Sequence, residues 1–150
     1  MTVLNCPDDH GFTLIEVIVA VAIVTILLAL ALPGYQGQVQ KTRRSLGGAE
    51  LLRVMMRQEQ HFVDHKRYAG ILTELGFPSS PYAIDAEGNA ADAIAGNRIY
   101  LINIATHRNN CTLYAIPQLS QAPDRECGTL SLDSMGTKLA SGPGAVQECW

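Results

Sequence analysis

The chain has 150 residues, four cysteines and a formal net charge of −3. This length suits one domain together with an extended helix. The weak negative charge gives no support to nucleic-acid binding. Since the sequence holds no Gly-rich phosphate loop, low-complexity tract or internal repeat, it favours neither a nucleotide-binding protein nor a repeat protein.

An apolar run over residues 12–32 is the strongest pattern in the chain. Apart from Thr13, Glu16 and Thr25, it consists almost wholly of Ile, Val, Leu and Ala. As a helix, about 21 residues reach across the ~30 Å hydrocarbon layer of a bilayer. A secretory signal would have a basic start and only ~7–15 apolar residues. Here Asp8 and Asp9 precede a longer run, so we expect a membrane-spanning helix.

Glu16 is the one charged residue in this run. A carboxylate inside hydrocarbon costs roughly 2.5–3.5 kcal/mol on insertion scales, so it usually has a partner. No Lys, Arg or His lies between residues 12 and 32, and the partner must therefore come from outside this helix. A plain membrane anchor explains the length of the run but not Glu16.

The stretch GFTLIEVIVAVAIVTILLALALPGYQ resembles the class III signal and N-terminal helix of type IV pilins. The resemblance implies that a prepilin peptidase removes residues 1–11 by cutting after Gly11. It implies that Phe12 then becomes the N-methylated first residue. It also implies that Glu16 meets the amino terminus of a neighbouring subunit in a filament.

The same resemblance implies one helix over residues 12–64, kinked near Pro33, with residues 12–32 in the membrane or the filament core. Apolar positions recur beyond the proline at steps of three and four residues, which predicts a face that packs on a sheet. These positions are Val39, Thr42, Leu46, Ala49, Leu52 and Met56. The basic residues Lys41, Arg44, Arg53 and Arg57 mostly lie off that face. The adjacent Gly47 and Gly48 are expected to allow bending or a close approach of the sheet.

Residues 65–150 are expected to form a globular domain with a small antiparallel sheet, so the fold class is α+β with the type IV pilin fold. Alternating patterns predict strands at residues 98–105, 111–117 and 127–133, with a possible fourth near 137–140. Residues 85–96 are rich in Ala, Gly and Asp and are expected to form an exposed loop. The resemblance also implies four buried anchors after the helix: Tyr68, Leu72, Leu75 and Phe77.

Three cysteines remain beyond the leader, which contains Cys6. No CxxC motif is present, and an oxidising compartment favours one disulfide with one thiol left over. We pair Cys127 with Cys149, which closes a loop of about 20 residues. Such a disulfide should add on the order of 3 kcal/mol to the free energy of unfolding. This pairing also resembles the disulfide-bounded C-terminal loop of many pilins. The sequence leaves open a pairing of Cys111 with either of the other two.

No catalytic, metal or cofactor site is expected. His61 and His65 are four residues apart beside Asp64, but the HExxH order and a nearby third ligand are lacking. Ser, His and Asp occur without a GxSxG elbow or other nucleophile context. The chain is therefore not expected to be an enzyme.

The segments CTLYAIPQ, CGTLSLDSMGTK and ECW resemble the C-terminal half of minor pilins of the PilE type. The implied function is a structural subunit of a type IV pilus, serving twitching motility, adhesion or DNA uptake. The precursor is expected in the bacterial inner membrane with its C-terminal domain in the periplasm, and the assembled form at the cell surface.

The implied partners are other pilin subunits, the prepilin peptidase, the inner-membrane assembly platform and, before assembly, membrane lipid. The basic cluster of Lys41, Arg43 and Arg44 most simply meets lipid headgroups or acidic neighbours. The cluster alone does not establish nucleic acid as a partner.

Two alternatives remain. A pseudopilin of a type II secretion system uses the same helix, and its major form often has a calcium site in place of a C-terminal disulfide. The cysteine pair and Trp150 favour the pilus. A membrane-anchored periplasmic enzyme would leave Gly11 uncut and would show a hydrolytic or redox activity.

Overall fold

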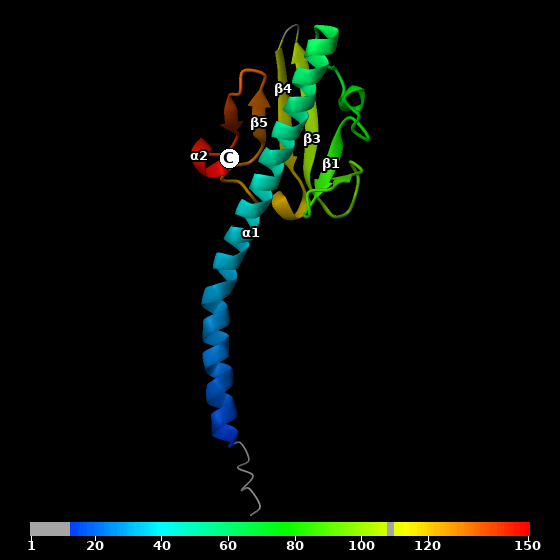
Figure 1. Cartoon of the computed structure of the whole chain (residues 1–150). Helices are drawn as coiled ribbons and strands as arrows, with labels where there is room; N and C mark the ends of the chain where they lie inside the picture. Colours follow the sequence, from blue (N-terminus) through cyan, green and yellow to red (C-terminus); the bar gives the residue numbers. More distant parts are fainter. Residues whose placement is uncertain (1–12, 108–109) are drawn as a thin grey trace, which may run out of the picture. The chain divides into compact units, whose positions relative to one another are not determined.

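The computed structural model describes residues 13–107 and 110–150, without the side chains of residues 31–34. The chain divides into two compact units, one ending at Gly37 and the other comprising Gln38–Trp150. Helix α1 (Leu14–His65) contributes to both units (Figure 1). The expected helix over residues 12–64 is thus found with almost the same bounds.

In the first unit, α1 begins at a polar cap. Thr13 lies just before the helix, and its Oγ1 accepts a hydrogen bond of 3.4 Å from the backbone N–H of Glu16. A carboxylate in the first turn also interacts favourably with the helix dipole. The helix continues through position 33, as expected. The kink near Pro33 stays a prediction, because it depends on how the two units are oriented.

In the second unit, α1 buries a face different from the expected one. Leu51, Val54 and Gln58 have no exposed surface, whereas Leu52 and Met56 are exposed. Thr42 and Ala49 are exposed as well, so the predicted packing face was wrong. The reason is that the buried face includes glycine and polar residues, which hydrophobic periodicity does not count.

Two glycines lie at the centre of this buried face. A Cβ atom at Gly47 would lie only 3.0 Å from the Tyr100 ring, and one at Gly48 would lie 3.4 Å from the Trp150 ring. The absence of side chains here lets two aromatic rings contact the helix backbone. The expectation that these glycines allow a close approach of the sheet is confirmed for Gly47.

The sheet has six antiparallel strands in the order β2-β1-β3-β4-β5-β6. The bounds are β1 Tyr82–Asp85, β2 Ala90–Ala91, β3 Arg98–His107, β4 Asn110–Pro117, β5 Leu130–Asp133 and β6 Lys138–Ala140. β3 and β4 form the long central hairpin, in register from Tyr100↔Pro117 to His107↔Asn110. Figure 1 shows α1 lying across one face of the sheet within this unit.

The strands match the expectation except for β1, β2 and the start of β5. Sequence reasoning missed β1, and it assigned β2 to the loop over residues 85–96. The strand expected from residue 127 begins only at Leu130, because Cys127 and Gly128 belong to the preceding loop. Strand β6 lies where the possible fourth strand was expected.

The core lies between α1 and the sheet. Leu51 and Val54 of the helix cluster with Ile102, Leu113 and other buried residues of β1 and β3 to β5. On β4 the buried residues Cys111, Leu113 and Ala115 alternate with half-buried ones, as expected for a sheet with one core-facing side. Short helices η1 (Leu72–Leu75), η2 (Leu119–Gln121) and α2 (Val146–Cys149) complete the unit.

The connection from α1 to β1 is fastened by a side-chain amide. Gln58 Nε2 donates to the carbonyl of Ala69 at 3.0 Å, and its Oε1 accepts from the Ala69 N–H at 2.9 Å. Of the expected anchors, Leu72, Leu75 and Phe77 are buried. Tyr68 is only half-buried, with its ring against Phe62.

Candidate functional site

The first part of α1 presents apolar side chains with no cover within the subunit. Every Leu, Ile and Val between residues 14 and 30 is more than half exposed. By length and composition this helix could cross a membrane. Because contiguous exposed apolar surface of this size marks an interaction site, this segment requires lipid or other helices around it.

Glu16 is exposed on this segment. Among the residues that the structure describes, no cationic side chain forms an ion pair with it. A partner for its charge must therefore come from the N-terminal residues or from another molecule. Gly11 and Phe12, the expected cleavage and methylation positions, lie outside the described residues.

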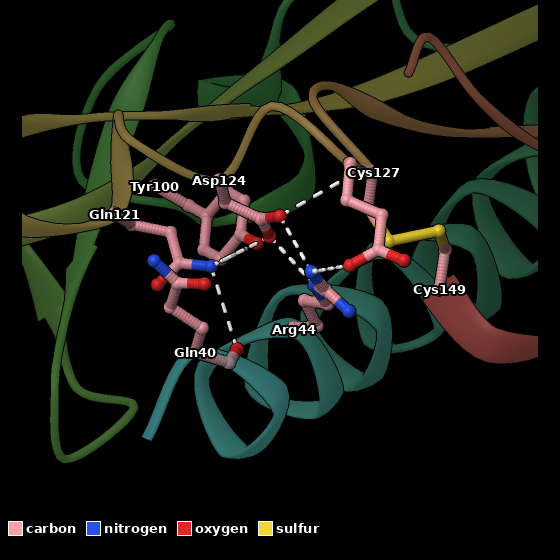
Figure 2. A network of polar contacts seen from close by, with 8 residues as sticks. Gln40, Arg44, Tyr100, Gln121, Asp124, Cys127 and Cys149 are labelled. Carbon is pink, nitrogen blue, oxygen red and sulfur yellow. Dashed lines mark hydrogen bonds and ion pairs between the residues drawn. A yellow bond between two sulfur atoms is a disulfide. The ribbon is translucent and has the colours of Figure 1, made fainter. Parts of the chain in front are cut away.

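A buried ion pair joins α1 to the loop between β4 and β5. Arg44 Nε and Nη2 each donate a hydrogen bond of 2.6 Å to the two carboxylate oxygens of Asp124 (Figure 2). The Asp124 side chain has no exposed surface, and that of Arg44 is 11% exposed. This hydrogen bonding raises the pKa of Arg44, although burial opposes it. The pair is bidentate, the strongest geometry for guanidinium and carboxylate.

Gln121 extends the pair into a network. Its Nε2 lies 2.9 Å from Asp124 Oδ2, 3.3 Å from Tyr100 Oη and 3.4 Å from the Gln40 carbonyl (Figure 2). Burial raises the pKa of Tyr100 to about 12, so that its hydroxyl stays protonated. The network thus connects α1, β3 and the loop over residues 118–128 through Gln121 and Asp124.

A hydrogen bond connects the network to the disulfide. Asp124 Oδ1 accepts a 3.4 Å hydrogen bond from the Cys127 N–H, and Cys127 is bonded to Cys149. The expected pairing is therefore present, and Cys111 is a buried free thiol, which removes the alternatives. Trp150 Nε1 donates to the Leu139 carbonyl at 2.9 Å, so the last residue of the chain is attached to β6.

A second buried carboxylate, Glu50, lies on α1 itself, six residues after Arg44. Glu50 accepts hydrogen bonds from Arg53 and from the Tyr82 hydroxyl of β1. Burial raises the pKa of Tyr82 above its ordinary value, and the bond to Glu50 adds to this. Two buried carboxylates, Asp124 of the loop and Glu50 of the helix, therefore bind α1 to the loop after β4 and to β1.

The His61 and His65 pair does not form a metal centre in the described structure. The two rings are stacked with centroids 4.1 Å apart, and His61 Nε2 is 4.0 Å from Glu74. A surface hollow of about 400 Å³ lies beside them. Within residues 13–107 and 110–150, no group of three or more His, Cys, Asp or Glu is arranged to hold a metal ion.

Sequence reasoning missed the Arg44–Asp124 pair. It placed Arg44 in a basic cluster facing lipid or neighbours, and this is corrected by its burial against Asp124. Asp124 follows Ala122-Pro123, a pattern typical of an ordinary exposed turn. No signal in a single sequence connects two charges 80 residues apart.

Breaking this pair should strongly destabilise the domain. Arg44→Leu leaves Asp124 buried without its counter-charge, and we expect a loss of about 3–5 kcal/mol in the free energy of unfolding. Denaturant unfolding of the full chain in detergent, followed by the fluorescence of the single tryptophan Trp150, measures this change.

The matched control is Glu126→Gln, because Glu126 lies 3.5 Å from Arg44 but is 62% exposed. Exposed pairs contribute about 0–1 kcal/mol, so this variant should unfold almost as the wild type does. Equal stability of Arg44→Leu and wild type would contradict the assigned role of the pair.

Comparison with known families covers most of the chain. The model of the family described as "Type IV minor pilin ComP, DNA uptake sequence receptor" matches residues 33–131. A model described as "Prokaryotic N-terminal methylation motif" matches residues 6–32, which include Gly11, Phe12 and Glu16.

Two individual proteins are also similar to this chain. The type IV major pilin protein PilA of Myxococcus xanthus (strain DK1622) is 32% identical over 91 residues, or 61% of this chain. The chain spans 40% of that relative's length. A solved structure of a type IV pilin from Shewanella oneidensis is 21% identical, covers 74% of this chain and 97% of that chain, and has a TM-score of 0.47.

The long helix on an antiparallel sheet, the apolar N-terminal segment and the C-terminal disulfide are thus found in a chain whose residues 33–131 match one family model. The protein belongs to the family of type IV minor pilins described as ComP, DNA uptake sequence receptor.

Proposed function

We propose that the chain is made as a prepilin, cut after Gly11, methylated at Phe12 and assembled with other pilins into a type IV pilus. The observation that carries this proposal is the apolar segment of α1, whose side chains have no cover in the subunit and include one carboxylate. The match of residues 6–32 to the methylation motif supports the cleavage position. The family is one of structural pilins and not of enzymes.

Location follows from the same segment. Before assembly the apolar helix resides in the inner membrane, where lipid covers its side chains. The domain is then periplasmic, and the Cys127–Cys149 disulfide suits that oxidising side. After extraction from the membrane, the helices of other subunits replace lipid around this segment.

Glu16 gives the bundle its register. In a filament the amino group of Phe12 on one subunit lies beside the Glu16 carboxylate of another, and both charges leave water together. A buried pair often contributes little net stability, because desolvation offsets attraction. An unpaired charge is costly, however, so subunits that miss the register are disfavoured.

Mature subunits should begin at Phe12. Mass spectrometry of sheared surface filaments should find this chain with a methylated Phe12 and with Cys127 bonded to Cys149. Gly11→Val should abolish cleavage, because the peptidase no longer finds a small residue at the cut. On a gel, the Gly11→Val strain should show only the uncut precursor. A free Phe12 terminus in that strain would contradict the assignment of the cleavage position.

Removing the charge of Glu16 should impair assembly but not membrane insertion. Glu16→Ala and Glu16→Gln should both accumulate in the membrane and be depleted in sheared filaments. The glutamine variant is the key comparison, because it keeps a polar side chain at the end of the Thr13 capping turn while lacking charge. Normal incorporation of Glu16→Gln would show that the charge has no role in register.

The family description supports a second, finer function, which is recognition of DNA by the domain. All eleven Lys and Arg lie beyond residue 37 together with eleven Asp and Glu, so the second unit is formally neutral. Arg44 and Arg53 are bound to carboxylates. Lys41, Arg43 and Arg125 have no carboxylate within ion-pair distance among the described residues.

Arg43 and Arg125 belong to segments that are in contact. Arg43 Nη1 donates to the Ser120 carbonyl at 3.2 Å, which joins it to the loop that carries Arg125. Lys41 lies two residues before Arg43 on α1. We assign Lys41, Arg43 and Arg125 contact with DNA phosphates, which are the dominant source of affinity for nucleic acid.

Neutralising these three basic residues should weaken DNA binding. A triple change of Lys41, Arg43 and Arg125 to Ala should lower affinity about tenfold or more at low salt and reduce the salt dependence. Fluorescence anisotropy with labelled duplex DNA measures both. The control changes Lys66 and Arg67, beyond the other end of α1, to Ala. Equal binding by both variants, or no binding by the wild type, would contradict the DNA function.

A further inference from the structure

One end of the domain presents two exposed apolar side chains on different loops. Leu119 is 46% exposed and Ile94 is 83% exposed. Leu119 opens η2 just after the end of β4, and Ile94 lies between β2 and β3. A single exposed apolar residue is ordinary, so the significance of these two depends on what lies beside them.

A shared arginine holds the two loops together. Arg98, at the start of β3, donates from Nη1 to the Ala95 carbonyl at 2.8 Å. Its Nε donates to Gln118 Oε1 at 3.4 Å. Ala95 follows Ile94 directly, and Gln118 directly precedes Leu119. The two apolar side chains therefore belong to neighbouring parts of one surface.

Helix α1 adds cations to this surface. Arg43 Nη1 donates to the carbonyl of Ser120, the residue after Leu119, at 3.2 Å. Lys41 is exposed two residues earlier on the helix. Among the residues that the structure describes, neither cation forms an ion pair. We name Lys41, Arg43, Ile94 and Leu119 the docking face.

Leu119 has an unusual backbone conformation. Its φ is 42°, in the left-handed region that residues with bulky side chains rarely adopt. The same side chain remains 46% exposed, so the conformation does not serve to bury it in the core. Uncommon backbone geometry of this kind gathers at functional sites. A partner outside the subunit gives the exposed leucine a role.

We propose that the docking face binds the surface of an anionic lipid bilayer while the subunit resides in the membrane. This inference rests on the proposed membrane residence before assembly. Leu119 and Ile94 enter the headgroup layer, and Lys41 and Arg43 bind lipid phosphates. The sequence favoured lipid for these two cations from their charge alone. The fold adds two loops to that contact, because it places them beside the helix.

The place of the docking face along α1 suits this occupant. Lys41 lies six residues beyond Tyr35, about 9 Å along an α-helix, and Tyr35 is 70% exposed. Tyrosine is typical of the boundary between membrane and water, and the headgroup layer is roughly 5–8 Å thick. Side chains on a helix lean toward its N-terminus, so Lys41 and Arg43 extend toward the end of α1 that carries the apolar segment.

The apolar side chains distinguish lipid from DNA as the occupant. Phosphates of either attract Lys41 and Arg43. Leu119 and Ile94 gain nothing from a phosphate backbone, whereas a bilayer offers them hydrocarbon. Asp92 is exposed two residues before Ile94, so the attraction to anionic lipid comes from the helix side of the docking face.

An environment-sensitive fluorescent side chain at position 119 or 94 tests the proposal. The full chain is reconstituted in bilayers of phosphatidylglycerol and phosphatidylcholine. Both probes should shift their emission to the blue and be quenched by brominated lipid. Emission typical of water at both positions would overturn the proposal.

Position 135 provides the matched control probe. Met135 is 80% exposed, and the N–H of its neighbour Ser134 bonds to the carbonyl of Cys111 at the start of β4. Leu119 follows the other end of that strand, so the control lies away from the docking face. Quenching at position 135 equal to that at position 119 would contradict a defined docking face.

Substitutions separate the charged and apolar parts, with the probe kept at position 94. Arg43→Ala should lower the equilibrium constant for docking about fivefold, the change expected from one cation near an anionic surface. Leu119→Ser should also lower it, and Met135→Ser should leave it unchanged. Wild-type quenching in both the Arg43 and the Leu119 variants would overturn the proposal.

DNA binding and membrane residence are measured on the same proteins. Leu119→Ser should bind labelled duplex DNA as the wild type does. A loss of DNA binding with unchanged quenching at position 94 would assign the surface to DNA and overturn the lipid contact. Failure of the chain to float with bilayers in a density gradient would refute membrane residence itself. If the chain floats and both probes stay in water, the docking face alone is refuted.

Discussion

The apolar surface of the first part of α1 is the constraint from which the rest of the structure follows. Its Leu, Ile and Val side chains between residues 14 and 30 are more than half exposed in the subunit. In water such a surface favours aggregation, so the segment requires lipid or other helices around it. The same helix also belongs to a folded domain, and its second part, beyond residue 37, packs in a separate core.

Polar side chains do much to fix the second part of α1 on the sheet. Arg44, Glu50 and Gln58 lie on the buried side of α1, and each is bound to a different part of the domain. Such pairs add little net stability compared with apolar packing, but they penalise every wrong position of the helix on the sheet. Gly47, against the Tyr100 ring, adds a steric condition to the polar ones. Helix register is therefore specified by four residues that a hydrophobic pattern would overlook.

The sequence alone predicted the features that depend on local patterns or on a short motif. These include the long helix, the central hairpin of β3 and β4 and the C-terminal disulfide. It missed β1, whose Tyr82–Asp85 follows a proline-rich turn and is short. It also missed Asp124, because its partner is distant in sequence and burial of the pair depends on the tertiary fold. The presence of a charged residue indicates that it needs a partner if it is buried, but it does not indicate which residue that partner is.

The error in the predicted packing face of α1 has a physical cause. The domain part of this helix has two faces that can each be buried: one contains Leu51 and Val54, and the other contains Leu52 and Met56. Periodicity reports that a face is apolar, but not whether the chain's own sheet or another molecule covers it. The sheet covers the face with the glycines, because only there can Tyr100 and Trp150 approach the backbone. The other face keeps its apolar pattern and is exposed, so the pattern alone does not show which face packs on the sheet.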